Sequence, residues 1–146
     1  MTLTGIGVYG HTLESFLEEL RTKAVAAVVD VRAFRGLRGK KYRWANSKAL
    51  QDALRASDLQ YLHLKRLAPP SELRMIQHAH DVSARMRKSE GVVLADDFRE
   101  RYRQYAQTVL TQELVALIPN RAALLCVESN DEACHRSVLI ELLRGR

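Results

Sequence analysis

One short segment near the end of the sequence, ESNDEACHRS at residues 128–137, contains several side chains that can act as an acid, a base or a nucleophile. It follows the apolar run AALLCV (122–127) and precedes the apolar run VLIELL (138–143), so it is expected to connect a strand to a helix. A thiol near cationic groups at a helix start can become a nucleophilic thiolate, and a carboxylate can act as a general base. The candidate residues in this segment are Glu128, Cys134, His135 and Arg136.

An acidic and a basic residue, Asp30 and Arg32, lie at the end of another apolar run, AVAAVVDV at 24–31. With the two-residue period of a strand, both side chains fall on the same side and can reach a common partner. Two interpretations remain open. In the first, these two residues form a structural ion-pair network with Glu128 and Arg136. In the second, the two arginines bind an anion and one of the two carboxylates acts as the base.

His11 follows Gly10 at the exit of an expected first strand. It can donate to a phosphate or act as a general acid, and capping of the next helix is an equally open role. No spacing to a partner assigns a role to the other internal histidines, His63, His78 and His80. A zinc site would need convergence of residues far apart in the sequence, namely His11, Glu128, Cys134 and His135. Nothing local supports it, so no metal and no cofactor are expected.

Two cysteines, Cys126 and Cys134, are too few for a disulfide framework. Cys126 lies inside an apolar strand and is expected to be core. Cys134 is interpreted as a small packed thiol on the helical face of Val138 and Leu142, in preference to a nucleophile. The cysteine–arginine loop of phosphatases is absent, because the residue six positions after Cys134 is Ile140.

A dense basic segment, RAFRGLRGKKYRW at residues 32–44, contains no acidic residue and interleaves aromatic rings with cations. Such a surface attracts polyphosphates, and its rings can stack on bases. A solubilising basic loop is the alternative interpretation. Beyond Arg32, the candidate contacts to nucleic acid are Arg35, Arg38, Lys40, Lys41, Arg43 and Trp44.

The elements that must position these residues alternate along the chain. Apolar runs predict strands over residues 5–10, 24–31, 59–64 and 122–127. Helical spacing predicts helices over residues 11–23, 46–57, 71–91, 97–118 and 131–145, the first with Thr12 as its N-cap. This alternation predicts a single three-layer α/β domain over 1–146, with a mostly parallel sheet of about four strands flanked by helices. The polar residues named above then leave the carboxyl ends of strands, where ligands bind in open parallel sheets.

Composition sets the broad class of protein. The chain has 146 residues, 47% of them hydrophobic and 27% charged, with a formal net charge of +6, which indicates one folded basic domain. No run approaches the roughly 18 apolar residues of a membrane span, and no secretory signal precedes the first strand. These features favour a reducing, cytoplasmic location without membrane contact, and they leave the oligomeric state open.

Four segments carry a resemblance to a known family: IGVYGHT (6–12), VVDVRAF (28–34), LQYLHLKRLA (59–68) and LLCVESNDEACHR (124–136). The most specific is the last, with its Cys-x-Glu followed by Cys-His-Arg. By these segments the chain resembles domain of unknown function number 488 over nearly its whole length. The resemblance implies a small α/β fold with polar residues at strand ends, and it implies no particular reaction.

The leading hypothesis is an enzyme, or an enzyme-derived domain, that binds a phosphorylated or nucleic-acid-related anion at the carboxyl ends of the strands. Arg32 and Arg136 would bind the anion together with Gly10 and His135. Acid–base or nucleophilic roles would fall to Glu128, Asp30, His11 and Cys134. The alternative is a non-catalytic nucleic-acid-binding module that uses the basic loop 32–44.

Overall fold

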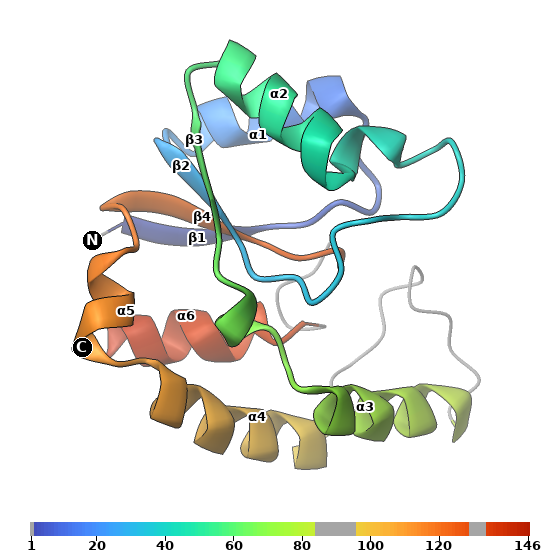
Figure 1. The fold of residues 1–146 in the computed structure, drawn as a ribbon, viewed down its shortest axis with the longest axis vertical. Helices are drawn as coiled ribbons and strands as arrows, with labels where there is room; N and C mark the ends of the chain where they lie inside the picture. The colour runs from blue at the N-terminus through green and yellow to red at the C-terminus, as the bar shows by residue number, and fades with distance from the viewer. Residues whose placement is uncertain (1, 84–95, 129–133) are drawn as a thin grey trace.

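The fold was obtained as a computed structural model, and the structure describes residues 2–83, 96–128 and 134–146. Its centre is a four-stranded, all-parallel sheet formed by β1 (Thr2–Ile6), β2 (Ala27–Asp30), β3 (Gln60–His63) and β4 (Arg121–Leu125) (Figure 1). The strand order is β1-β4-β2-β3, so the last strand of the chain lies between the first two. The central strands β2 and β4 are almost wholly buried, as their continuous apolar sequence predicts.

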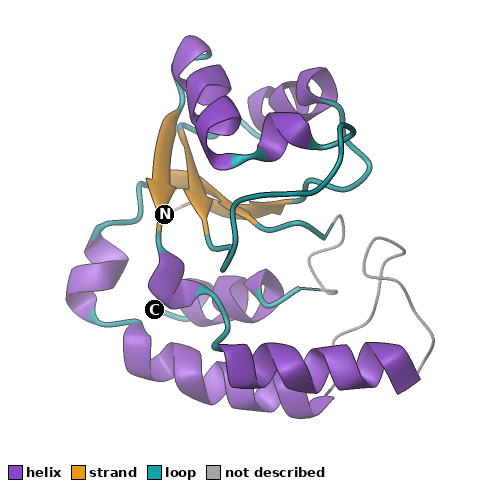
Figure 2. Cartoon of the chain, turned by 45° about the vertical axis from the view of Figure 1, so that its right-hand side comes forward, coloured by secondary structure: helices purple, strands orange, loops and turns teal. Residues whose placement is uncertain are grey.

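Helices cover both faces of the sheet (Figure 2). One face carries α1 (Leu13–Thr22) and α2 (Ser47–Ala56), and the other carries α4 (Asp96–Val109) and α6 (Arg136–Arg144), with α3 (Ser71–Ser83) packed on α4. The short helix α5 (Gln112–Ala116) leads into β4. Separate hydrophobic cores fill the two spaces between sheet and helices. The predicted three-layer α/β architecture with a parallel sheet is therefore confirmed.

Some element boundaries differ from the predicted ones. The first strand pairs with β4 from Thr2 to Ile6, whereas residues 5–10 were predicted, because glycines and apolar residues of the exit loop resemble a strand. The helix predicted over 97–118 is two helices, since Thr111 accepts a hydrogen bond from the Leu114 backbone and starts α5. The last helix begins at Arg136, and residues 131–133 of its predicted range lie outside the described residues, as do residues 84–91 of the helix predicted over 71–91.

The connections from β1 and β4 leave the sheet toward opposite faces. The helix that follows β1 is α1, on one face, and the helix that follows the neighbouring β4 is α6, on the other (Figure 1). In open α/β sheets such a divergence marks the edge at which ligands bind. Among the helices that the structure describes, none has the length and apolar character needed to cross a bilayer.

Candidate functional site

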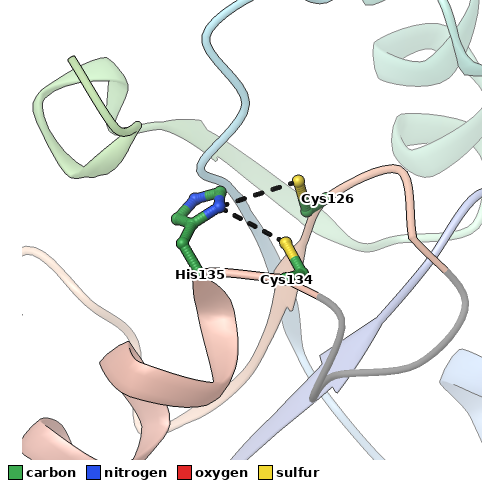
Figure 3. A group of neighbouring side chains, drawn as sticks. All are labelled: Cys126, Cys134 and His135. Atoms are coloured by element: carbon green, nitrogen blue, oxygen red, sulfur yellow. Dashed lines mark hydrogen bonds between the residues drawn. The ribbon is translucent and has the colours of Figure 1, made fainter. Parts of the chain in front are cut away.

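Two thiols and an imidazole meet at the carboxyl edge of the sheet (Figure 3). Cys126 follows β4, and Cys134 and His135 precede α6. The Nδ1 atom of His135 lies 3.3 Å from Sγ of Cys134 and 4.0 Å from Sγ of Cys126, and the three atoms all lie within 4.8 Å of one another. The three residues are buried, with exposed fractions of 8% for Cys126, 3% for Cys134 and 5% for His135. We call these three residues the thiol–imidazole cluster.

The tautomer of His135 follows from its second ring nitrogen. Nε2 lies 3.0 Å from the backbone oxygen of Val31, at the end of β2. A carbonyl oxygen can only accept, so Nε2 carries the hydrogen and donates it. In the neutral ring, Nδ1 therefore directs its lone pair toward the two sulfur atoms. The edge-on ring of Tyr102, with its centroid 5.2 Å away, packs against the imidazole and holds this orientation.

The two thiols differ in acidity. The hydrogen bond from Cys134 lowers the pKa of Cys126 well below its usual value against the effect of burial, and the neighbouring His135 and Arg136 lower it further. Burial and the neighbouring Cys126 raise the pKa of Cys134 well above its usual value. These opposite shifts make Cys126 the more acidic thiol of the pair, with Cys134 as its hydrogen-bond donor.

Packing at Cys134 differs from the prediction. The side chain lies in a small cluster with Cys126 and Val127, against Tyr9 and Leu37. The predicted neighbours, Val138 and Leu142, belong to the core around α4 instead. The prediction was wrong because it placed Cys134 inside the last helix, whereas the helix begins at Arg136 and the helical spacing does not extend back to the thiol.

Asp30 and Arg32 form a buried ion pair beside the thiol–imidazole cluster. Nε and Nη2 of Arg32 donate to the two carboxylate oxygens of Asp30 at 2.9 and 2.8 Å, and Nη1 donates to the backbone oxygen of Ala45 at 2.9 Å. The hydroxyl of Tyr61 also donates to Asp30, at 2.6 Å. All three guanidinium nitrogens therefore have protein acceptors, which favours the structural interpretation for this pair. The residue between them, Val31, accepts the hydrogen bond of His135.

The guanidinium group of Arg136 is fully buried and joins the ends of β1 and β4. Nη1 donates to the backbone oxygens of Ile6 and Cys126 at 2.6 and 3.4 Å, and Nη2 donates to the backbone oxygen of Glu128. Three carbonyl groups that leave two parallel strands thus share one cation. Glu128 itself is buried, with an exposed fraction of 3%. Arg136 fixes the backbone on both sides of the thiol–imidazole cluster.

His11 interacts with α1, the helix that it precedes. Its Nδ1 lies 2.9 Å from Oγ of Ser15, and its Nε2 lies 3.5 Å from a carboxylate oxygen of Glu19. Thr12 is the N-cap, as predicted, with a capping box to Ser15. Gly10 has a φ of 88°, a conformation that favours glycine, and its amide donates to the hydroxyl of Tyr42 at 3.0 Å. These contacts agree with the helix-capping role of His11.

The basic loop is anchored next to the thiol–imidazole cluster. Leu37 packs against the two cysteines, and its amide donates to the side chain of Asn46 at 2.6 Å. Tyr42 lies against the ring of Tyr9. The indole of Trp44 packs on Phe16, with centroids 4.9 Å apart, so it contributes to the core under the loop and not to an open stacking surface. Four cations of the loop are exposed: Arg38, Lys40, Lys41 and Arg43.

Two residues of this site have no counterpart among the sequence-based candidates. Cys126 was expected to be core; it is buried, but it also faces His135. Tyr61 supports Asp30 from the edge strand β3. The sequence holds one signal for Cys126: it ends an apolar strand and precedes the Cys134–His135 pair by eight residues. Nothing in the sequence singles out Tyr61.

Tyr61 provides a pH-dependent test of the ion pair. Partial burial raises the pKa of Tyr61 from 10.0 to about 12, aided by the hydrogen bond to Asp30 and opposed by Arg35. Because the folded pKa is raised, the stabilisation is complete below pH 10 and is lost as pH rises toward 12. Tyr61→Phe should lower the free energy of unfolding by about 1–2 kcal/mol at pH 7. Urea unfolding of both proteins should show this difference shrinking between pH 10 and 12; a constant difference would contradict the assignment.

Comparisons with known proteins identify the family. A search of the curated proteins and a search of the solved structures found no match. The family model described as "Domain of unknown function DUF488" matches residues 12–143. This range includes the ion pair of Asp30 and Arg32 and all three residues of the thiol–imidazole cluster. The chain therefore belongs to the DUF488 family, as the resemblance of its strand-end segments predicted.

Proposed function

We propose that this protein is an enzyme that acts on an anionic, phosphorylated or nucleotide-like ligand at the carboxyl edge of its sheet. The observation that carries the proposal is the thiol–imidazole cluster, in which the pKa of the Cys126 thiol is lowered and which lies beside a loop with four exposed cations. An acidic thiol, an imidazole and a buried carboxylate within a few residues are typical of reactive centres, and a loop with exposed cations attracts phosphates.

The proposed role of each arginine depends on whether its guanidinium group already donates hydrogen bonds to acceptors in the protein. Arg32 and Arg136 donate to protein acceptors, so binding of the anion falls to the loop cations Arg38, Lys40, Lys41 and Arg43. The thiol–imidazole cluster is the reactive centre. Glu128, two residues after Cys126, is the carboxylate proposed to accept a proton during turnover.

The test separates binding from turnover. Inorganic phosphate, pyrophosphate and nucleoside mono- and diphosphates should be titrated by calorimetry, and conversion of the organic phosphates followed by 31P NMR. The double substitution Lys40→Ala/Lys41→Ala should weaken binding at least tenfold, and its effect should fade at high salt because exposed charges are screened. Cys126→Ser and Glu128→Gln should abolish turnover and leave binding within a few-fold. Failure of all these probes to bind, or binding that does not depend on the loop, would overturn the proposal.

A nucleic-acid-binding module is the second candidate function, and one observation favours it. The ring of Phe34 is 72% exposed in the same loop, with the guanidinium of Arg74 stacked over it at 4.8 Å. An exposed ring among cations can stack on a base of a single strand. For a short single-stranded oligonucleotide, a plot of log affinity against log salt concentration should then have a slope of about −3 if four or so cations contact phosphates, at roughly 0.7 per phosphate. In that case Phe34→Ala should weaken binding without changing the slope, and Cys126→Ser should have no effect.

A further inference from the structure

We propose that Cys126, Cys134 and His135 form the binding site of a divalent metal ion of borderline-soft character, for which Zn²⁺ is the best match. The proposal deepens the function proposed above by naming a cofactor for its reactive centre. The role of the ion in turnover rests on that proposed function. Metal binding does not rest on it, because binding is argued from the donor atoms alone.

The spacing of the donor atoms fits a tetrahedral zinc ion. With Zn–S bonds of about 2.3 Å and Zn–N bonds of about 2.05 Å, tetrahedral angles place sulfur and nitrogen ligands about 3.6 Å apart. The two sulfur–nitrogen distances in the cluster, 3.3 and 4.0 Å, lie on either side of this value. All three donor atoms lie within 4.8 Å of one another and point toward a common centre (Figure 3). Small side-chain rotations are sufficient to complete the geometry.

His135 already has the hydrogen bond that supports a metal-binding histidine. Metal-ligating imidazoles usually donate their second nitrogen to a carboxylate or a backbone carbonyl, which fixes the tautomer and directs the other lone pair at the ion. Nε2 of His135 makes this bond to Val31, leaving Nδ1 to face both sulfur atoms. The lone pair that accepts hydrogen bonds from the thiols in the metal-free protein is the one that would bind the ion.

The charge balance of the buried cluster also favours a cation. Binding of Zn²⁺ to two thiols releases two protons and leaves two thiolates, one neutral imidazole and one dication, whose charges sum to zero. A neutral centre is compatible with burial, whereas two unneutralised thiolates in the same place are not. The fully buried guanidinium of Arg136 donates to the backbone oxygen of Cys126, so a positive charge lies next to one of the two sulfur ligands.

Among the described residues, the cluster offers three protein donors, the number that catalytic zinc sites use. Structural zinc sites are closed by four protein ligands, and catalytic ones leave a position for water or substrate. The fourth position would then accept water or an oxygen of the anionic ligand, next to the loop that carries the exposed cations. A metal ion there would lower the pKa of bound water and polarise the ligand.

The experiment measures metal binding directly, without an activity assay. The full chain is reduced, stripped with a chelator, and titrated with Zn²⁺ against a chromophoric zinc chelator. We expect one ion per chain and the release of up to two protons. Cys126→Ser, Cys134→Ser and His135→Gln should each weaken binding by more than the 10–100-fold that loss of a supporting partner costs. The matched control is His11→Gln, which should bind as the wild type does, since the ring nitrogens of His11 contact Ser15 and Glu19 of α1 and not the cysteines.

A spectroscopic measurement on the wild type removes the dependence on the variants' folding. Co²⁺ in place of Zn²⁺ should give sulfur-to-cobalt charge-transfer absorption in the near ultraviolet and the strong visible bands of a tetrahedral ion. Absence of the charge-transfer band, or Zn²⁺ affinity equal in the wild type and in Cys126→Ser, would overturn the metal site. If it is overturned while Cys126→Ser still abolishes turnover, the thiolate itself is the reactive group and the proposed function stands. If Zn²⁺ binds but no phosphorylated probe does, the metal site stands and the proposed function falls.

Discussion

Asp30→Ala is expected to lower the free energy of unfolding by about 3–5 kcal/mol, because it leaves the guanidinium of Arg32 buried without its counter-ion. Arg32 is only 2% exposed and donates two hydrogen bonds to the carboxylate from its side chain and a third from its backbone amide. Water cannot replace these acceptors without opening the structure. The hydroxyl of Tyr61 loses its acceptor at the same time.

Urea unfolding, followed by far-UV circular dichroism, measures this loss. The double variant Asp30→Ala/Arg32→Met should be markedly more stable than Asp30→Ala alone, because it removes the unpaired charge together with its former partner. Asp30→Asn should lie between the wild type and Asp30→Ala, since the amide oxygen still accepts one bond. A loss below about 1 kcal/mol for Asp30→Ala would show that the pair is not buried as described.

Arg136→Met is expected to cost at least about 3 kcal/mol, since three backbone carbonyl groups lose a charged donor and each unsatisfied buried group costs about 1–3 kcal/mol. Methionine fills much of the volume of the side chain, so the loss reports hydrogen bonding more than packing. The acceptors belong to the ends of β1 and β4 and to Glu128. The substitution should therefore loosen the backbone on both sides of the thiol–imidazole cluster.

Arg144→Met is the matched control for this prediction. Arg144 lies on the same helix, and its guanidinium also donates to a carbonyl of β1, that of Leu3, at 2.8 Å, but the residue is exposed. Water can replace an exposed donor, so its loss should cost less than about 1 kcal/mol. Chemical denaturation of the two variants at pH 7 gives the comparison. Equal losses of unfolding free energy in the two variants would contradict the argument that burial makes the hydrogen bonds of Arg136 more costly to remove.

The elements of this fold are predictable from the sequence because its strands are short, apolar and separated by amphipathic helices. The continuous apolar runs at 24–31 and 122–127 predict buried strands, and both strands are central in the sheet. The strand order was not predictable, because parallel pairing depends on which helices pack on which face. The exit of the first strand was misjudged, since Val8 is as buried as any core residue but lies beyond the last residue of β1.

The site was only partly predictable, for a similar reason. Asp30, Arg32, Glu128 and Arg136 stand out because charged residues at the ends of apolar runs need partners. Which partner each takes is decided by tertiary contacts: Arg136 binds carbonyl groups, and Arg32 binds Asp30. A cysteine at the end of an apolar strand looks like core. Only the return of the chain to the start of α6 brings Cys126 to His135.

The position of β4 in the sheet has a consequence for folding during synthesis. Within the part of the chain that the structure describes, β1 pairs with β4 alone, so β1 cannot join the sheet until residues 121–125 have been synthesised. Before β4 is available, β2 can pair only with β3. The edge of β2 that later pairs with β4 then stays open, and this exposed apolar strand can associate with other chains. Contacts that span almost the whole sequence also slow folding. Insertion of β4 between β1 and β2 is therefore the step that closes the sheet and covers this edge.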